Sequence, residues 1–308
     1  MGRKLMTKPT NELALFIITY GPAKIGKTLA TVRAVPDGLF IAPRGALTCA
    51  RYLDWEPKVI ETGPDMGIAK ITEVIKQGQD KFPAIIIDDF SIICDQELAA
   101  CKKSHAGWSA FDVFNKRVYD LRDAARAASC HVILNMHEQA PKEVGQSDEK
   151  RWVKGCPMVP GWQLPEKLPS HADLVLRVVY DEKAVGWPYL YQSGPDPDYI
   201  TGDRLAITPE RFPLNLREVL KLAGCDLPRP EELAHFDPLV DEICKDLIPE
   251  LATKRPKVKD LLSSWAQKLT DEDKLCPQHM RWIFSDALDR AHLTQHNNNL
   301  VSNFINNL

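Results

Sequence analysis

The sequence predicts an α/β fold with a central, mostly parallel sheet, followed by a small region of helices. Three observations lead to this prediction. Short apolar segments alternate with helix-like stretches between residues 13 and 177, which is the rhythm of parallel strands joined by crossover helices. The first apolar segment leads directly into the pattern G-x-x-x-x-G-K-T at residues 21–28. Beyond the proline-rich stretch 227–230, only helical patterns follow.

Each predicted element has its own signal. Apolar runs bounded by polar or turn residues predict strands at 13–19, 39–42, 58–61, 84–87, 131–135 and 174–180. Apolar side chains at helical spacing predict a helix over 110–128 with one buried face. The strand at 174–180 and a further one at 187–192 read as a hairpin.

The C-terminal part reads as three helices, at residues 238–251, 258–269 and 277–292. We therefore expect two domains: a core of residues 1–228 and an α-helical domain of residues 229–308.

Composition and charge narrow the class of protein. The 308 residues carry a net charge of −3, so the whole molecule does not attract nucleic acid and any contact with DNA must be local. No stretch is apolar and long enough for a signal peptide or a bilayer span, which predicts a protein of the (host) cell cytoplasm without a membrane partner. The eight cysteines form no C-x-x-C pair, so we expect reduced core thiols and neither disulfides nor a zinc site.

The segment at residues 21–28 has the spacing of a phosphate-binding loop. Its glycines let the backbone N–H groups wrap a triphosphate, Lys27 reaches the β- and γ-phosphates, and Thr28 offers its hydroxyl to Mg²⁺. We expect ATP and Mg²⁺ as cofactors. The predicted nucleotide-binding residues are Gly21, Pro22, Ala23, Lys24, Ile25, Gly26, Lys27, Thr28 and Leu29.

A second acidic element follows the apolar run 84–87. Asp88 would come to the carboxyl edge of the sheet, where a carboxylate can hold Mg²⁺ together with Thr28. Asp89 has two readings: it orients or deprotonates the attacking water, or it caps the turn that follows. Glu61, after the third strand, is a weaker candidate for that acid, and Arg44 follows the second strand where an acid would be useful.

The strand predicted at 131–135 leads to His137 at the same edge of the sheet. A polar side chain there is placed to contact the γ-phosphate or the attacking water and to sense the bound nucleotide. The alternative is a histidine whose hydrogen bonds are satisfied at a strand end. We favour the sensor role because of the motifs on either side.

A long polar segment, residues 139–169, mixes cations with indoles. Loops of this length in a compact domain are usually functional or disordered. Single-stranded nucleic acid needs cations along its phosphates and flat rings for its bases. A lid over the nucleotide or a subunit contact would use the same side chains, and four acids dilute the charge. The nucleic-acid candidates are Lys150, Arg151, Trp152 and Lys154.

Several segments together resemble the phage-encoded P-loop ATPases with a RecA-like core, including the Sak-type single-strand annealing and recombination ATPases. They are residues 21–28, 85–89, 135–138, 160–161, 199–204 and 213–216, and the resemblance spans roughly residues 13–222. It implies a RecA-like ATPase that oligomerises, binds ATP between subunits and acts on single-stranded DNA in recombination or replication.

The same resemblance makes Arg204 the candidate for an arginine that completes a neighbouring subunit's site. Its alternative is a simple pair with Asp203 in a turn. Two positions depart from the pattern: Gly202 stands where we expect lysine, and Arg44 stands where we expect an acid. The helices after residue 230 match no pattern of the family and are candidates for docking a replication or recombination protein.

Three functions fit these patterns. The first is a DNA-stimulated ATPase of phage recombination or replication, with Lys27, Asp89, His137 and Arg204 as catalytic residues. The second is a helicase-loader-type or motor-associated ATPase that grips a partner through the C-terminal helices. The third is a nucleotide-binding assembly or regulatory protein with little turnover.

Overall fold

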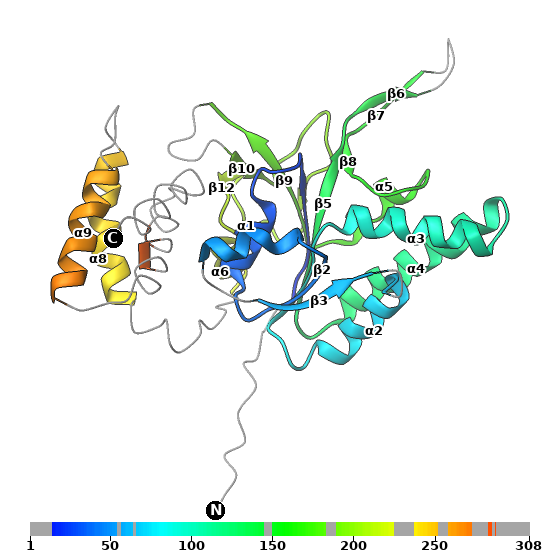
Figure 1. Cartoon of the computed structure of the whole chain (residues 1–308). Helices are drawn as coiled ribbons and strands as arrows, with labels where there is room; N and C mark the ends of the chain where they lie inside the picture. Colours follow the sequence, from blue (N-terminus) through cyan, green and yellow to red (C-terminus); the bar gives the residue numbers. More distant parts are fainter. Residues whose placement is uncertain are drawn as a thin grey trace, which may run out of the picture.

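The computed structural model of the chain describes residues 14–53, 57–63, 66–144, 150–182, 189–224, 237–251 and 258–272, with residues 283, 284 and 287. A ten-stranded sheet lies at its centre (Figure 1). Its strands are β1 (Phe16–Gly21), β2 (Leu39–Pro43), β3 (Lys58–Thr62), β4 (Ala84–Ile87), β5 (His131–Gln139), β8 (Cys156–Pro157), β9 (Leu174–Tyr180), β10 (Tyr189–Gln192), β11 (Gly202–Asp203) and β12 (Arg211–Pro213).

The order along the sheet is β12-β10-β9-β1-β5-β4-β2-β3, with β11 paired to β9 and β8 paired to β5. Six strands, β9-β1-β5-β4-β2-β3, are parallel, and the others join antiparallel. The predicted mostly parallel sheet is therefore confirmed, as is the β9–β10 hairpin pairing. A separate ribbon of β6 (Lys142–Val144) and β7 (Arg151–Val153) extends from the end of β5 (Figure 1).

The predicted strand bounds are right for β4 and β9 and too short for β5. We expected β5 to end at residue 135, but it continues to residue 139. Its polar end remains a strand because β1 pairs with it as far as His137, and β8 pairs with Glu138 and Gln139. The residues expected after this strand therefore lie on it. Likewise β1 reaches Gly21, two residues beyond the predicted end.

Helices cover both faces of the sheet. They are α1 (Lys27–Ala34), α2 (Ile68–Gly78), α3 (Phe90–Ser104), α4 (Trp108–Ala127), α5 (Leu164–Lys167) and α6 (Leu216–Leu222), with short 3₁₀ helices η1 (Ala46–Leu53) and η3 (Pro169–His171). Alternate residues of β1 point to opposite faces, as in any strand. Phe16 and Ile18 pack in the core with α2, α3 and α4, whereas Leu15 and Ile17 pack with α1 and α6.

One buried carboxylate joins three of these helices. Glu97 of α3 is 4% exposed and accepts the backbone N–H of Ile68, the first residue of α2, at 2.8 Å. It also forms an ion pair with Arg117 of α4. Since the first N–H groups of a helix have no partner within it, Glu97 acts as the acceptor that α2 lacks.

Beyond the sheet, the chain forms α8 (Asp237–Leu251) and α9 (Val258–Glu272), which contact each other. Two of the three predicted C-terminal helices are thus confirmed. The third lies largely outside the described residues, and so does the expected domain boundary at residues 228/229, which stays a prediction.

The six cysteines within the described residues form no disulfide, and five are buried. No helix in that part of the chain is long and apolar enough to cross a membrane.

Candidate nucleotide-binding site

The phosphate-binding loop lies between β1 and α1, as its pattern predicts. Gly26 precedes α1 with φ = 95°, a left-handed conformation that favours glycine. Gly21 is closely packed, because a Cβ there would lie 2.8 Å from Cδ1 of Ile25 and 3.1 Å from Cβ of Val178. Both glycines of the motif therefore hold positions that a larger residue would strain.

The side chain of Lys27 folds back into this loop. Its side chain donates to the carbonyl oxygens of Gly21 (3.1 Å) and Pro22 (2.6 Å), and the residue is 7% exposed. Burial lowers the pKa of Lys27 to about 8, opposed by the nearby Asp88 and Asp89. The ammonium group thus lies inside the loop with only carbonyl oxygens as hydrogen-bond partners, and phosphate oxygens would be better acceptors.

Thr28 and Asp88 meet, as predicted for a magnesium site. The Thr28 hydroxyl lies 3.0 and 3.1 Å from the two carboxylate oxygens of Asp88. Burial raises the pKa of Asp88 to about 6, while hydrogen bonds from Asn135 and Thr28 and the charge of Lys27 act against that rise. Hydroxyl and carboxylate oxygens are ligands that Mg²⁺ prefers, so this pair fits the ion.

Asn135 joins the two halves of the site, and the sequence interpretation gave it no role of its own. Its amide nitrogen donates to Asp88 at 2.7 Å. Its amide oxygen accepts from the hydroxyls of Thr19 (2.6 Å) and Thr31 (3.2 Å). The amide is 1% exposed, so these bonds hold the Asp88 carboxylate against Thr28. The signal in the sequence was a polar residue that follows three apolar residues in a predicted strand.

Asp89 faces His137 across the same edge of the sheet. The Asp89 carboxylate lies 3.4 Å from Nε2 of His137. Asp89 precedes α3 in a left-handed conformation (φ = 50°) and makes no side-chain capping bond. The structure therefore does not show the capping alternative for Asp89. The two candidate catalytic side chains lie together, each about 30% exposed, where a water can reach them.

The opposite face of β5 carries a half-buried ion pair that the sequence interpretation missed. Glu138 accepts from Nε of Arg177, a β9 residue, at 2.7 Å. The guanidinium lies over the ring of Tyr199 at 3.2 Å, and Tyr20 donates its hydroxyl to the carbonyl of Ile200 at 2.7 Å. These contacts attach the loop 193–201 to the strands that carry the nucleotide site.

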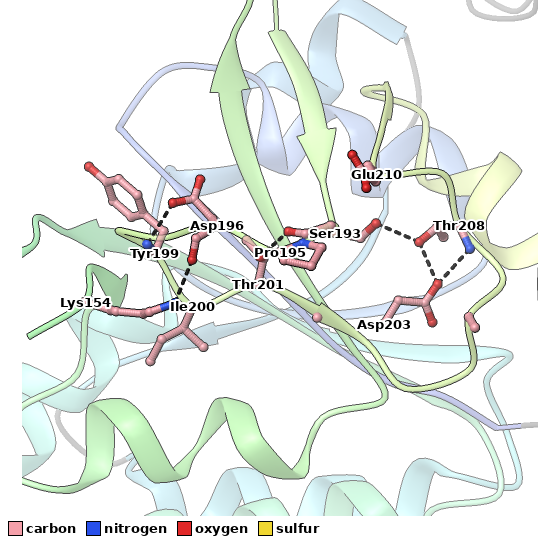
Figure 2. A pocket seen from close by; sticks show the side chains of 13 residues that line it. Lys154, Ser193, Pro195, Asp196, Tyr199, Ile200, Thr201, Asp203, Thr208 and Glu210 are labelled. Atoms are coloured by element: carbon pink, nitrogen blue, oxygen red, sulfur yellow. Dashed lines mark hydrogen bonds between the residues drawn. The ribbon is translucent and has the colours of Figure 1, made fainter.

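The four nucleic-acid candidates lie on or beside the β6–β7 ribbon, but most of their polar atoms have partners. Lys150 pairs with Glu143 at 3.1 Å, and the Arg151 guanidinium lies 5.4 Å over the ring of Trp162. Trp152 donates its indole N–H to Asp198 (3.2 Å), and Lys154 donates to the carbonyl of Asp196 (2.6 Å; Figure 2). The rings of Trp152 and Trp162 remain exposed, at 56% and 74%.

A hollow of about 500 Å³ lies beside the loop 193–201. Lys154, Asp196 and Asp203 are among the residues that line it (Figure 2). No residue of the phosphate loop lines it. Asp203 accepts three backbone N–H groups, from Leu205, Ile207 and Thr208, and so shapes a turn. The hollow is thus separate from the nucleotide site.

Arg204 does not pair with Asp203, contrary to the alternative expected for it. Its guanidinium donates to the carbonyl of Ser170 (2.8 Å) and lies 3.9 Å from Asp173. Asp173 accepts the backbone N–H of Phe16, the first residue of β1. The phosphate loop begins at the other end of this strand, at Gly21. Arg204 therefore lies at the opposite edge of the sheet, about 16 Å of strand from Gly21. It is therefore too far from the phosphate loop of its own chain to contact a nucleotide there.

The weaker candidates lie away from this centre. Glu61 is exposed on the edge strand β3, two strands from β4. Arg44 is exposed after β2, so β2 brings no acid to the site. Within the described residues, no group of three or more His, Cys, Asp and Glu side chains could hold a metal ion on its own.

The site combines a loop between β1 and α1 that holds a buried lysine with a second parallel strand, β4, whose terminal acid lies beside the loop's threonine. These features define a P-loop nucleotide-binding protein of the ATPase class. Residues 14–205 match the family described as AAA domain, which covers well over half of the chain. The chain therefore belongs to this AAA-domain family of P-loop ATPases. No curated protein matches it.

Proposed function

We propose that this AAA-domain protein hydrolyses ATP while acting on single-stranded DNA, as in the phage-encoded Sak-type recombination ATPases that its sequence resembles. One observation carries the proposal. Strand β5 carries Asn135 and His137 and is followed two residues later by the β6–β7 ribbon, which carries Trp152 and Arg151. A movement of β5 at the nucleotide site would therefore also move the ribbon, and DNA bound to the ribbon would act on the nucleotide site through the same strand.

The residues divide the chemistry between them. Lys27 and the loop N–H groups bind the β- and γ-phosphates, and Thr28 and Asp88 hold the magnesium ion, which neutralises charge as it develops in such reactions. Asp89 orients the attacking water, and His137 positions Asp89 or contacts the water itself. Asn135 keeps Asp88 in its orientation.

The first test is ATP hydrolysis with and without oligo-dT, for the wild type and two variants. Asp89→Asn should lose the DNA-stimulated rate by at least about a hundredfold and still bind ATP, because only the acid is removed. Lys27→Ala should lose ATP binding while the fold remains. Retained ATP affinity in Lys27→Ala would contradict the site assignment, and full turnover in Asp89→Asn would remove Asp89 from it.

A second test concerns DNA binding by the ribbon. Replacing Arg151 and Trp152 by alanine should weaken oligo-dT binding, since a base-stacking ring and a cation are lost. Basal hydrolysis should change little. Unchanged DNA affinity would favour the lid or subunit-contact interpretation of this segment.

The proposal includes an oligomer with nucleotide between subunits, completed by Arg204. Chains with Lys27→Ala keep Arg204 but cannot bind ATP at their own site. Chains with Arg204→Ala keep the ATP-binding residues but cannot supply the arginine to a neighbour. Each variant alone should be nearly inactive, and a mixture should regain partial activity if Arg204 acts in trans. A mixture as inactive as its components would exclude this role.

A protein with little turnover is the second candidate. It is favoured by the absence of an acid after β2, where Arg44 stands, and by the loop carbonyls that already engage Lys27. Tight ATP binding without hydrolysis, with or without DNA, would support it against the first proposal.

A further inference from the structure

The hairpin of α3 and α4 ends in an exposed tip, residues 102–109 (Figure 1). Trp108 is 82% exposed, the highest value among the large hydrophobic residues that the structure describes. Lys102 and Lys103, in the last turn of α3, are also exposed. No acid occurs between Lys102 and Phe111. The tip thus combines an uncovered indole with two cations in a chain whose net charge is negative.

The contacts within the tip orient these groups without neutralising them. The rings of Trp108 and Phe111 lie 5.8 Å apart, and Nζ of Lys102 lies 5.1 Å over the Phe111 ring. The ion pairs formed by described residues include neither Lys102 nor Lys103. Further along α4, Lys116, Arg117 and Arg122 form ion pairs with Asp120, Glu97 and Asp123. Arg126, at the other end of the helix, lies 3.4 Å from His171. The tip therefore carries two lysines that pair with no acid among the described residues.

A second indole and cation lie nearby along α4. Gly161 packs beside Asn115 of α4, since a Cβ on Gly161 would lie 3.5 Å from the Asn115 side chain. Asn115 is seven residues from Trp108, or about 10 Å along the helix. Trp162, next to Gly161, is 74% exposed beneath the guanidinium of Arg151. A single strand of a few nucleotides could therefore span from the tip to the surface formed by Trp162 and Arg151.

From these observations we infer that the α3–α4 tip is a second contact surface for single-stranded DNA, which extends the path that starts at the β6–β7 ribbon. The inference rests on the DNA-binding function proposed above. An exposed ring can stack on any base, and ammonium groups suit the phosphates of a polyanion. A duplex would not offer its base faces. The two unpaired lysines beside one indole match a single strand in charge and in shape.

The test is fluorescence anisotropy of labelled oligo-dT of roughly 20 nucleotides, longer than one such site. Trp108→Ala should weaken binding by at least about fivefold, the loss of one stacking ring, and Trp108→Phe should restore most of it. The double variant Lys102→Ala/Lys103→Ala should make the slope of log K against log salt shallower by about 1.4, for two lost phosphate contacts. The exposed lysines Lys70 and Lys76 of α2, both replaced by alanine, serve as the matched charge control and should leave the slope unchanged.

Each other result overturns the inference in a recognisable way. If the ribbon variant of Arg151 and Trp152 loses binding while the tip variants bind like the wild type, the tip is excluded and the proposed function stands. If the wild-type protein binds no oligo-dT, both proposals fail. If the tip variants lose binding only to phosphatidylserine vesicles, the surface serves a membrane and not DNA.

Discussion

Asn135 shows how one buried amide organises the candidate site. It uses both ends of its side chain, donating to Asp88 and accepting from Thr19 and Thr31. A buried amide of this kind costs free energy unless all of its hydrogen bonds are made. Asn135 makes three hydrogen bonds, to residues of β1, α1 and the end of β4, so the amide and the carboxylate fix each other's orientation.

We expect Asn135→Ala to raise the Mg²⁺ concentration needed for half-maximal hydrolysis about tenfold, the value of one hydrogen bond to a charged group. The physical reason is that Asp88 loses the donor that holds it against Thr28. Titration of MgCl₂ at saturating ATP measures the change.

The control for this variant is Thr72→Val. The Thr72 hydroxyl is buried as well, but it bonds only within α2, to the carbonyl of Ile68. This control should leave the Mg²⁺ dependence unaltered. If Asn135→Ala behaved in the same way, Asn135 would be a structural amide without influence on the metal site.

Strand β5 is the element that assembles the site. It lies between β1 and β4 in the sheet, although β4 precedes it in the chain by more than forty residues. Its alternating side chains serve two purposes at once. Asn135 and His137 contact Asp88 and Asp89, whereas Glu138 pairs with Arg177 on the other face. Its far end carries the ribbon, so the strand links three features of the molecule.

The first residue of β5 makes the stability of the fold depend on pH. His131 is fully buried, its Nδ1 accepts the backbone N–H of Leu15 at 3.1 Å, and burial lowers its pKa from 6.5 to about 4. The unfolded chain binds this proton below pH 6.5 and the folded chain only below about 4. Stability from His131 is therefore complete above pH 6.5 and falls, by up to about 3 kcal/mol, as the pH drops to 4.

Urea unfolding at several pH values from 7.5 to 4 measures this dependence. The variant His131→Gln keeps an acceptor for Leu15 but does not titrate, so its pH dependence should be flatter in that window. Equal slopes for the two proteins would show that other groups cause the acid sensitivity.

At the scale of the whole molecule, the described residues form two hydrophobic clusters, one on each face of the sheet. Every buried residue of both clusters lies between Leu15 and Leu220. The family match ends within the same region, at residue 205. Within the described residues, α8 and α9 contribute no side chain to either core.

A chain of residues 1–224 should accordingly fold and bind ATP within about twofold of the full-length affinity, because distant sites contribute independently. Isothermal titration with a non-hydrolysable ATP analogue measures it. If partner docking is the task of the C-terminal helices, the shortened chain should keep DNA-stimulated hydrolysis and lose the partner. Loss of ATP binding would mean that the C-terminal region belongs to the nucleotide site.

The sequence by itself determined the fold class, the phosphate loop, the paired acids after β4 and the helical C-terminal region. These features are local, because a loop of fixed spacing, a run of apolar residues or a helical period can be recognised within about 20 consecutive residues. Even the meeting of Thr28 and Asp88 could be anticipated, since the carboxyl ends of parallel strands share one edge of the sheet.

Only the tertiary structure decided which side chains touch. Strand order is not written in any local pattern, so the sequence could not place β5 between β1 and β4 or give Asn135 its contact with Asp88. It could not pair Arg177 with Glu138 across strands, nor show that Arg204 lies with Asp173 at the far edge of the sheet. The exposure of Trp108 belongs here too, because only the packing of α3 and α4 shows which side chains their connection leaves uncovered. Contacts between distant segments depend on how the layers assemble, and that is settled by the whole core rather than by any one segment.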